Sequence, residues 1–405
     1  MDSAFLTLPA AGDPHFPALT RKLRLLALRR LLRATPRACP AAPARLAEAA
    51  RAAPEAVLAA VGQVDTLAPL LCAEGGLPAG AGAADAVLPG LWVALQAGGA
   101  IAEPLLWDGP VARLVDLPRR RVLRFAAPAR GLFVAPGQAE LRLADGSIWP
   151  LDAPAPAGVD VEHPFLPLAG GAVLSTFDSN PLAHIEAHPE KGGNAVDLGG
   201  EALSSWGDAL GAAHALVCGA LPGWASEWPF ALQRVVPVGV LPEVHLSASY
   251  REAPGLVYLT LHPNRVTLAE ALIHETQHGK LNTLLHLDAV LHNGWTDWTP
   301  SPVRPDLRPL MGVLLAVHAF VPVAAFHAAL AAAGHPLADG PWFARRRAEV
   351  LAGNARGLDI LDARAAPTPA GRRLLDALHA VQDAAVAGLS PGDRAGIAAA
   401  DALPG

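Results

Sequence analysis

The stretch VTLAEALIHETQHGKLNTLLHLD (266–288) decides how this chain is organised. Thr267 followed by Glu270 matches the capping box that begins many helices, so we expect a helix to start there. His274 and His278 are four residues apart, which places both imidazoles on one helix face. H-E-x-x-H on a helix is the sequence form of a site in which two histidines bind a divalent metal. We therefore predict a metal site on this helix.

Glu275 lies about 100° around the predicted helix from His274. In a zinc peptidase a glutamate at this place is the general base. In another chemistry it would instead support the metal ligands. The sequence leaves both roles open.

A third ligand must come from outside the helix face. His286 points away from that face, because it is eight residues beyond His278. His318 lies in a wholly apolar run, where an unpaired imidazole is costly and a ligand role would explain it. His327 is nine residues further on and faces roughly the opposite side of its helix. We predict His318 as the third ligand, with a hydrogen-bonded core histidine as the alternative.

Two aspartates, Asp297 and Asp306, are rival third ligands, as in iron sites built from two histidines and one carboxylate. They belong to the segment WTDWTPSPVRPDLRPLMG (295–312), which also holds Arg304 and Arg308 among prolines. An arginine in such a stiff loop suits bidentate binding of a carboxylate. The alternative is a surface arginine that neutralises Asp306.

The remainder of the chain predicts an α+β fold that is mostly helical. We expect an N-terminal helical region (1–105), an antiparallel β-rich region (106–175), a metal-binding helical core (176–335) and a C-terminal helical region (336–405), packed as one composite unit. Short alternating runs with Pro and Gly turns indicate strands in 106–175, and VYLTLHP (257–263) indicates one more. Thr368 followed by Pro369 is typical of a helix start.

Composition excludes several classes of protein. The chain of 405 residues is 52% hydrophobic and 17% charged, with a net charge of −6, which is unlike a nucleic-acid binder. Its three cysteines form no C-x-x-C pair, which is compatible with a reducing cytoplasm. The uncharged stretch 312–334 is long enough to span a membrane but contains His318, Pro322 and His327. We therefore expect a buried helix there, and a cytoplasmic protein without membrane or nucleic-acid partners.

Several stretches together resemble a known family. HETQHGKL (274–281), SPVRPDLRPLMG (301–312), HAF (318–320), DSNPLAHIEAHPEKGGNAVDLGG (178–200) and SASY (247–250) resemble the HExxH-motif peptide-modification proteins of ribosomal-peptide (RiPP) gene clusters. The resemblance covers roughly 175–330. It implies an Fe(II)- and 2-oxoglutarate-dependent peptide β-hydroxylase that acts on a ribosomally synthesised precursor peptide with O₂.

The resemblance also implies roles for residues. His274 and His278 would bind iron with His318, while Arg304, Arg308 and Ser249 would bind the 2-oxoglutarate. Val303 departs from the aromatic residue expected before the first arginine.

Two other classes of function stay open from the sequence. One is a zinc metallopeptidase with Glu275 as general base, although the usual downstream third-ligand pattern is absent. The other is a peptide-binding partner with a degenerate site, against which the intact histidine pair argues.

Overall fold

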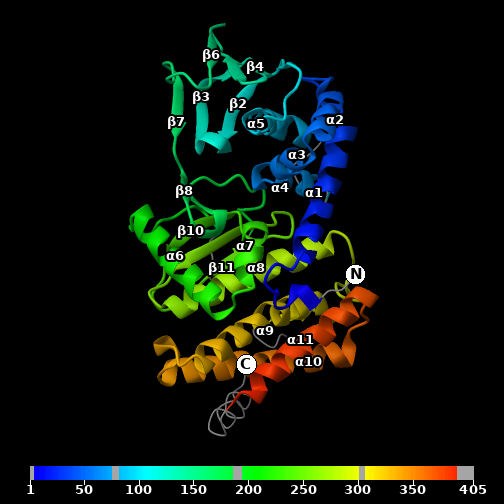
Figure 1. The fold of residues 1–405 in the computed structure, drawn as a ribbon, viewed down its shortest axis with the longest axis vertical. Coiled ribbons are helices and arrows are strands. Elements are labelled where there is room, and N and C mark those ends of the chain that lie inside the picture. The colour runs from blue at the N-terminus through cyan, green and yellow to red at the C-terminus, as the bar shows by residue number, and fades with distance from the viewer. Residues whose placement is uncertain (1–3, 75–81, 186–193, 301–305, 390–405) are drawn as a thin grey trace.

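The structure is a computed structural model that describes residues 4–74, 82–185, 194–300 and 306–389. Its elements form three tiers along the long axis of the molecule, and α1 (His15–Arg33) runs beside the upper two (Figure 1). The mixture of helices with antiparallel sheet confirms the α+β class.

The upper tier joins the N-terminal helices to two antiparallel sheets around one apolar core. Its sheets have the strand orders β1-β4-β5-β6 and β2-β3-β7. All their strand pairs are antiparallel, as expected for the β region that the sequence predicted. The elements are α2 (Ala42–Ala52), α3 (Pro54–Val61), α4 (Val64–Glu74), α5 (Ala83–Ala97), β1 (Leu105–Trp107), β2 (Val111–Asp116), β3 (Arg121–Ala129), β4 (Gly131–Ala135), β5 (Gln138–Arg142), β6 (Ile148–Pro150) and β7 (Val159–Glu162).

The middle tier is a five-stranded mixed sheet in the order β11-β12-β10-β9-β8. Strands β9, β10 and β12 are parallel, and the edge strands β8 and β11 are antiparallel to their neighbours. The end of the predicted β region therefore belongs to this sheet rather than to the upper tier. Its strands are β8 (Phe165–Pro167), β9 (Val173–Ser175), β10 (Arg234–Val240), β11 (Ser247–Ser249) and β12 (Leu256–Leu261).

The two faces of the middle sheet meet different helices. Val235, Val257 and Leu259 pack in one core with α6 (Leu203–Ala220), α7 (Trp224–Ala231) and α8 (Arg265–Leu285). Val236 and Tyr258 pack instead with Val64 of α4. The sheet thus lies between α8 and the upper tier.

The lower tier contains α9 (Leu310–Ala332), α10 (Pro341–Arg364) and α11 (Pro369–Ala387), below α8 (Figure 1). Thr368 caps α11 by accepting a hydrogen bond from the Gly371 amide, which confirms the predicted helix start. A short hairpin of β13 (Trp298–Pro300) and β14 (Leu307–Pro309) precedes α9. By length and composition α9 would also cross a membrane, but it packs against α8, α10 and α11 and is mostly buried.

Candidate metal centre

Helix α8 carries the histidine pair, but it does not begin where the sequence predicted. Asn264 is the N-cap residue, and its side chain accepts a hydrogen bond from the Val266 amide. The helix therefore starts at Arg265, and the predicted capping box of Thr267 and Glu270 is wrong. Glu270 is a buried residue in the second turn of the helix.

The two histidines of the motif face each other, as the four-residue spacing requires. The Nε2 atoms of His274 and His278 lie 2.9 Å apart. That separation is the length of a hydrogen bond between the two rings. With metal–nitrogen bonds of about 2.1 Å, two ligands of one metal lie about 3.0–3.4 Å apart, so small rotations of the rings would let both nitrogens bind the same ion.

The electrostatics of the pair also suit a metal. Burial lowers the pKa of His274 well below its ordinary value, and the charges of His278 and Arg346 lower it further. Burial lowers the pKa of His278 as well. Both imidazoles are therefore neutral near pH 7, which is the form that binds a metal.

Glu270 precedes His274 by one turn and anchors two other helices to α8. Its carboxylate accepts a hydrogen bond from His327 Nε2 of α9 at 2.8 Å. It also accepts two from Arg346 of α10, at 2.8 Å from Nε and 2.6 Å from Nη2. Burial alone would raise the pKa of Glu270, but His327 and Arg346 lower it to about 2. The Nε2 atom of His327 is thus held by the carboxylate of Glu270.

Phe320 links this ion pair to the histidines. Its ring centroid is 4.6 Å from that of His274 in an edge-on arrangement, and the Arg346 guanidinium carbon lies 5.8 Å from the same ring. The half-buried Arg346 is therefore a cation beside the histidine pair. The sequence analysis missed it, because Arg346 lies in a run of three arginines typical of a solvated helix face.

His318 is fully buried and close enough to the pair for their charges to act on it. Burial, Lys280 and His278 together lower its pKa to about 3. Its Nε2 donates a hydrogen bond to the Leu6 carbonyl at 3.0 Å, while Nδ1 has no hydrogen-bond partner in the described part of the chain. Within that part, no group of three or more His, Cys, Asp or Glu side chains is placed to hold one metal ion. The structure therefore brings His274 and His278 together, but His318 does not join them in a three-ligand cluster.

Residues of α8 bind the N-terminal segment on both sides of Leu6. Gln277 donates to the Thr7 carbonyl, and Lys280 donates to the Phe5 carbonyl at 3.3 Å. Together with His318, these side chains fix the turn at 4–7 against the helix pair that carries the site. Sequence reasoning had no local signal for this contact.

Lys280 also forms a buried ion pair beside the site. Its Nζ lies 2.7 Å from Glu227 Oε2 of α7, and both side chains are almost completely buried. The ammonium group lies 5.5 Å from the ring centroid of Phe16 and 5.6 Å from that of Trp224. Burial lowers the pKa of Lys280, and Glu227 opposes that shift.

Glu275 is only 2% exposed, and its Oε2 is buried without a hydrogen-bond partner among the described residues. The histidines on either side of it are half-buried. The carboxyl group is thus buried, and its charge is close enough to His278 to raise the pKa of that ring.

Three residues were predicted to bind the oxoacid. Arg304 lies outside the described residues. Arg308 is in β14 and pairs with Asp306 at 2.9 Å, which was its alternative role. Ser249 ends β11, and its Oγ is buried without a hydrogen-bond partner in the described structure.

The rival carboxylate ligands are also held elsewhere. Asp297 binds Arg364 of α10, and Asp306 binds Arg308.

No protein-family model matches this chain, and no curated protein matches its sequence.

Proposed function

We propose that this chain is an Fe(II)- and 2-oxoglutarate-dependent dioxygenase that hydroxylates a side-chain β-carbon of a ribosomally synthesised precursor peptide. The observation that carries the proposal is the His274–His278 pair, whose Nε2 atoms lie 2.9 Å apart on one face of α8 and could bind one metal ion. The resemblance of 175–330 to HExxH peptide-modification proteins supplies the reaction class.

The histidines would hold the iron, with His318 as the predicted third ligand. When bound, iron with 2-oxoglutarate and O₂ supplies an oxidant that replaces a hydrogen of the peptide side chain with a hydroxyl group. One oxygen atom of O₂ enters the peptide and the other enters succinate, with release of CO₂. Low pKa values of His274 and His278 keep both rings unprotonated for the metal.

Arg346 is our candidate for the cation that binds the 2-oxoglutarate carboxylate. Its charge acts on His274, and it packs on Phe320 next to that ring. Glu270 binds its Nε and Nη2 atoms and so fixes the direction of the guanidinium. Arg304, Arg308 and Ser249 stay the candidates that the resemblance implies, and Arg308, like Arg346, is already paired with a carboxylate.

The alternative function is a zinc metallopeptidase. It requires Glu275 to face a zinc-bound water as general base. The burial of Glu275, with its Oε2 turned away from solvent, argues against that role.

Mass spectrometry of the cognate precursor peptide after incubation with enzyme tests the proposal. With Fe(II), 2-oxoglutarate and O₂, we expect an intact chain that has gained one oxygen atom, with succinate formed in equal amount. The His274→Ala variant is the control and should give neither product. Two shorter peptides formed with zinc in the absence of O₂ would show that the protein is a peptidase.

A further inference from the structure

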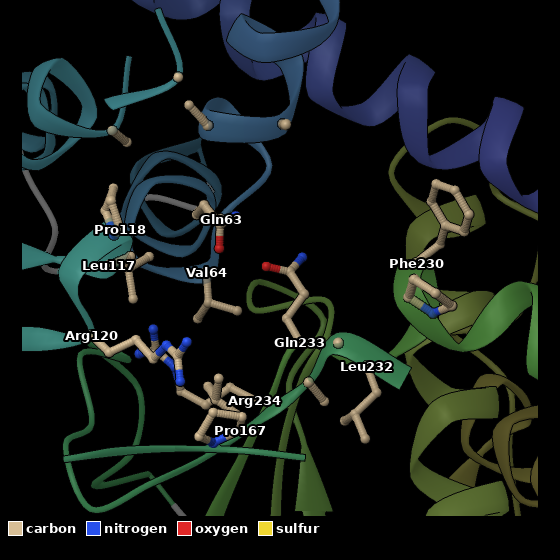
Figure 2. A pocket seen from close by; sticks show the side chains of 18 of the residues that line it. Gln63, Val64, Leu117, Pro118, Arg120, Pro167, Phe230, Leu232, Gln233 and Arg234 are labelled. Atoms are coloured by element: carbon tan, nitrogen blue, oxygen red, sulfur yellow. The ribbon is translucent and has the colours of Figure 1, made fainter. Parts of the chain in front are cut away.

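A cavity of about 790 Å³ lies between the upper tier and the middle sheet (Figure 2). Its walls come from α1, α3, α5, the turn after β2 and the segments around β9 and β10. This volume is within the range of ligand sites, which often form where parts of a protein meet. None of its described lining residues belongs to α8, α9 or α10, so the cavity is separate from the histidine pair.

The chemistry of the lining favours an anionic ligand. Small and apolar residues make most of the wall, and Gln63, Gln233 and three arginines supply the polar groups. No aspartate or glutamate is among the lining residues that the structure describes. Arg234 is neutralised from behind, because both its terminal nitrogens bind Asp65. Among the described lining residues, Arg24 and Arg120 then supply the positive charges that no such ion pair neutralises.

Arg120 is presented to the cavity by its neighbours. The fully buried Asp116 binds Arg119 at 3.3 Å and Arg121 at 2.8 Å, one on each side of Arg120. Arg120 itself has a left-handed backbone with φ 51°, a strained conformation for a residue with a side chain. It has no ion pair within the described residues, and Figure 2 shows it at the cavity near Leu117 and Pro118.

Arg24 comes from the opposite wall, on α1. Its side chain lies against Gly62, where an added Cβ would be 2.2 Å from Nε. That Nε is buried without a hydrogen-bond partner in the described structure, and so is Oε1 of Gln233. Burial lowers the pKa of Arg24, and the charge of Glu55 opposes that shift. Arg24 forms no ion pair with a described carboxylate, so an anionic ligand in the cavity would serve as its counter-ion.

We propose that this cavity binds an acidic segment of the peptide substrate, with its carboxylates on Arg24 and Arg120 and its apolar side chains against Val64 and Leu117. The identity of the ligand rests on the proposed function. Because none of the described lining residues belongs to α8, this segment would be distinct from the residue that is modified. It would hold the peptide while another part of it reaches the metal centre.

Fluorescence anisotropy with a defined probe tests the proposal. The probe is a short fluorescein-labelled peptide in which leucine and glutamate alternate, and the matched peptide carries glutamine in place of every glutamate. We expect saturable binding of the acidic peptide only. Arg24→Gln and Arg120→Asn should each raise its Kd about tenfold, because each removes a charge-assisted hydrogen bond. Asparagine suits the left-handed backbone at 120.

Arg29→Gln is the matched control, since Arg29 is an exposed arginine of α1 that does not line the cavity. It should bind the probe as the wild type does. Equal binding of both peptides, or equal Kd values for all three variants, would overturn the proposal. Binding of octanoate without binding of the acidic peptide would also overturn it, in favour of a small-molecule site.

The His274→Ala variant separates this inference from the proposed function. We expect it to bind the acidic probe with unchanged Kd, because the cavity does not involve the metal centre. Loss of binding in that variant would contradict a separate site. Failure of hydroxylation with intact probe binding would count against the dioxygenase and leave the peptide site standing.

Discussion

His318 Nε2 donates a hydrogen bond to the carbonyl oxygen of Leu6, 3.0 Å away and 312 residues earlier in the chain. This bond fixes the tautomer of the ring, so that the lone pair is on Nδ1. That atom is buried and has no hydrogen-bond partner among the described residues. Histidines that bind metals commonly donate their other N–H to a backbone carbonyl in this way. The contact therefore leaves His318 in the state that a metal ligand requires.

Replacing His318 with glutamine distinguishes two roles of this residue. One is to bind the metal, and the other is to hold the N-terminal segment through a hydrogen bond. Glutamine still donates to a carbonyl but offers no imidazole. We expect His318→Gln to bind iron at least tenfold more weakly. His327→Gln is the matched control, because His327 is equally buried on α9 and also donates through Nε2. Metal analysis that shows equal iron content in both variants would remove His318 from the site.

Sequence reasoning found what depends on local spacing and missed what depends on distant contacts. His274 and His278 are one helix turn apart, so their convergence follows from helix geometry alone. The partners of Glu270 are 57 and 76 residues away, on α9 and α10. The pattern Thr267-x-x-Glu270 also matched a capping box. Nothing in the local sequence showed that Glu270 is instead a buried partner of residues on α9 and α10.

In the fold, too, features set by local sequence were predicted and features set by distant contacts were not. The strand at 256–261 and the start of α11 at Thr368 were predicted from a short apolar run and a cap. The parallel pairing of β9, β10 and β12 was not predicted, because it joins segments separated by long stretches of chain. The two strands at 165–175 were predicted as part of one β-rich region, and they pair in the middle sheet.

The buried pair of Lys280 and Glu227 gives a prediction about stability. Lys280→Met should lower the free energy of unfolding by about 3–5 kcal/mol, because Glu227 would be left as an unpaired buried charge. Adding Glu227→Gln should recover most of that loss. Denaturant titration of the two single variants and the double variant measures the coupling. Additive losses would contradict a direct interaction.

Glu270 gives a prediction about pH. Its pKa is lowered from 4.5 to about 2, because the bonds from His327 and the charge of Arg346 outweigh its burial. A carboxyl group with a lowered folded-state pKa stabilises the protein above its unfolded pKa and loses that effect as pH falls. We expect the wild type to lose about 3 kcal/mol of unfolding free energy between about pH 4.5 and 2 through this group. Glu270→Gln should be less stable at pH 7 and should lack this component of the acid dependence. Parallel pH profiles of the two proteins would refute the prediction.

Substitutions of Arg346 and Arg308 should have different effects on the KM for 2-oxoglutarate. Arg346→Lys keeps a charge near Glu270 but removes the planar guanidinium, so the KM for 2-oxoglutarate should rise about tenfold. Arg308→Lys should leave that KM unchanged, since Arg346 is the arginine whose charge acts on His274. Succinate formation as a function of 2-oxoglutarate concentration gives both values. A raised KM in Arg308→Lys alone would transfer the role to the loop before α9.

Glu275→Gln distinguishes the two candidate chemistries by the size of its effect. Glutamine has the shape of glutamate but cannot accept a proton from water. A peptidase would lose several orders of magnitude in kcat, because its general base would be gone. In the proposed hydroxylase the carboxylate is buried beside the ligands and takes no proton, so kcat should fall less than about tenfold while the iron content stays the same. The unfolding free energy should stay within about 1 kcal/mol of the wild type, since the change removes a charge whose Oε2 has no hydrogen-bond partner in the described structure. Single-turnover kinetics of oxygen incorporation, measured on variants with equal iron content, provides the comparison. A loss of activity as deep as that of His274→Ala, with iron retained, would place Glu275 in the chemistry itself.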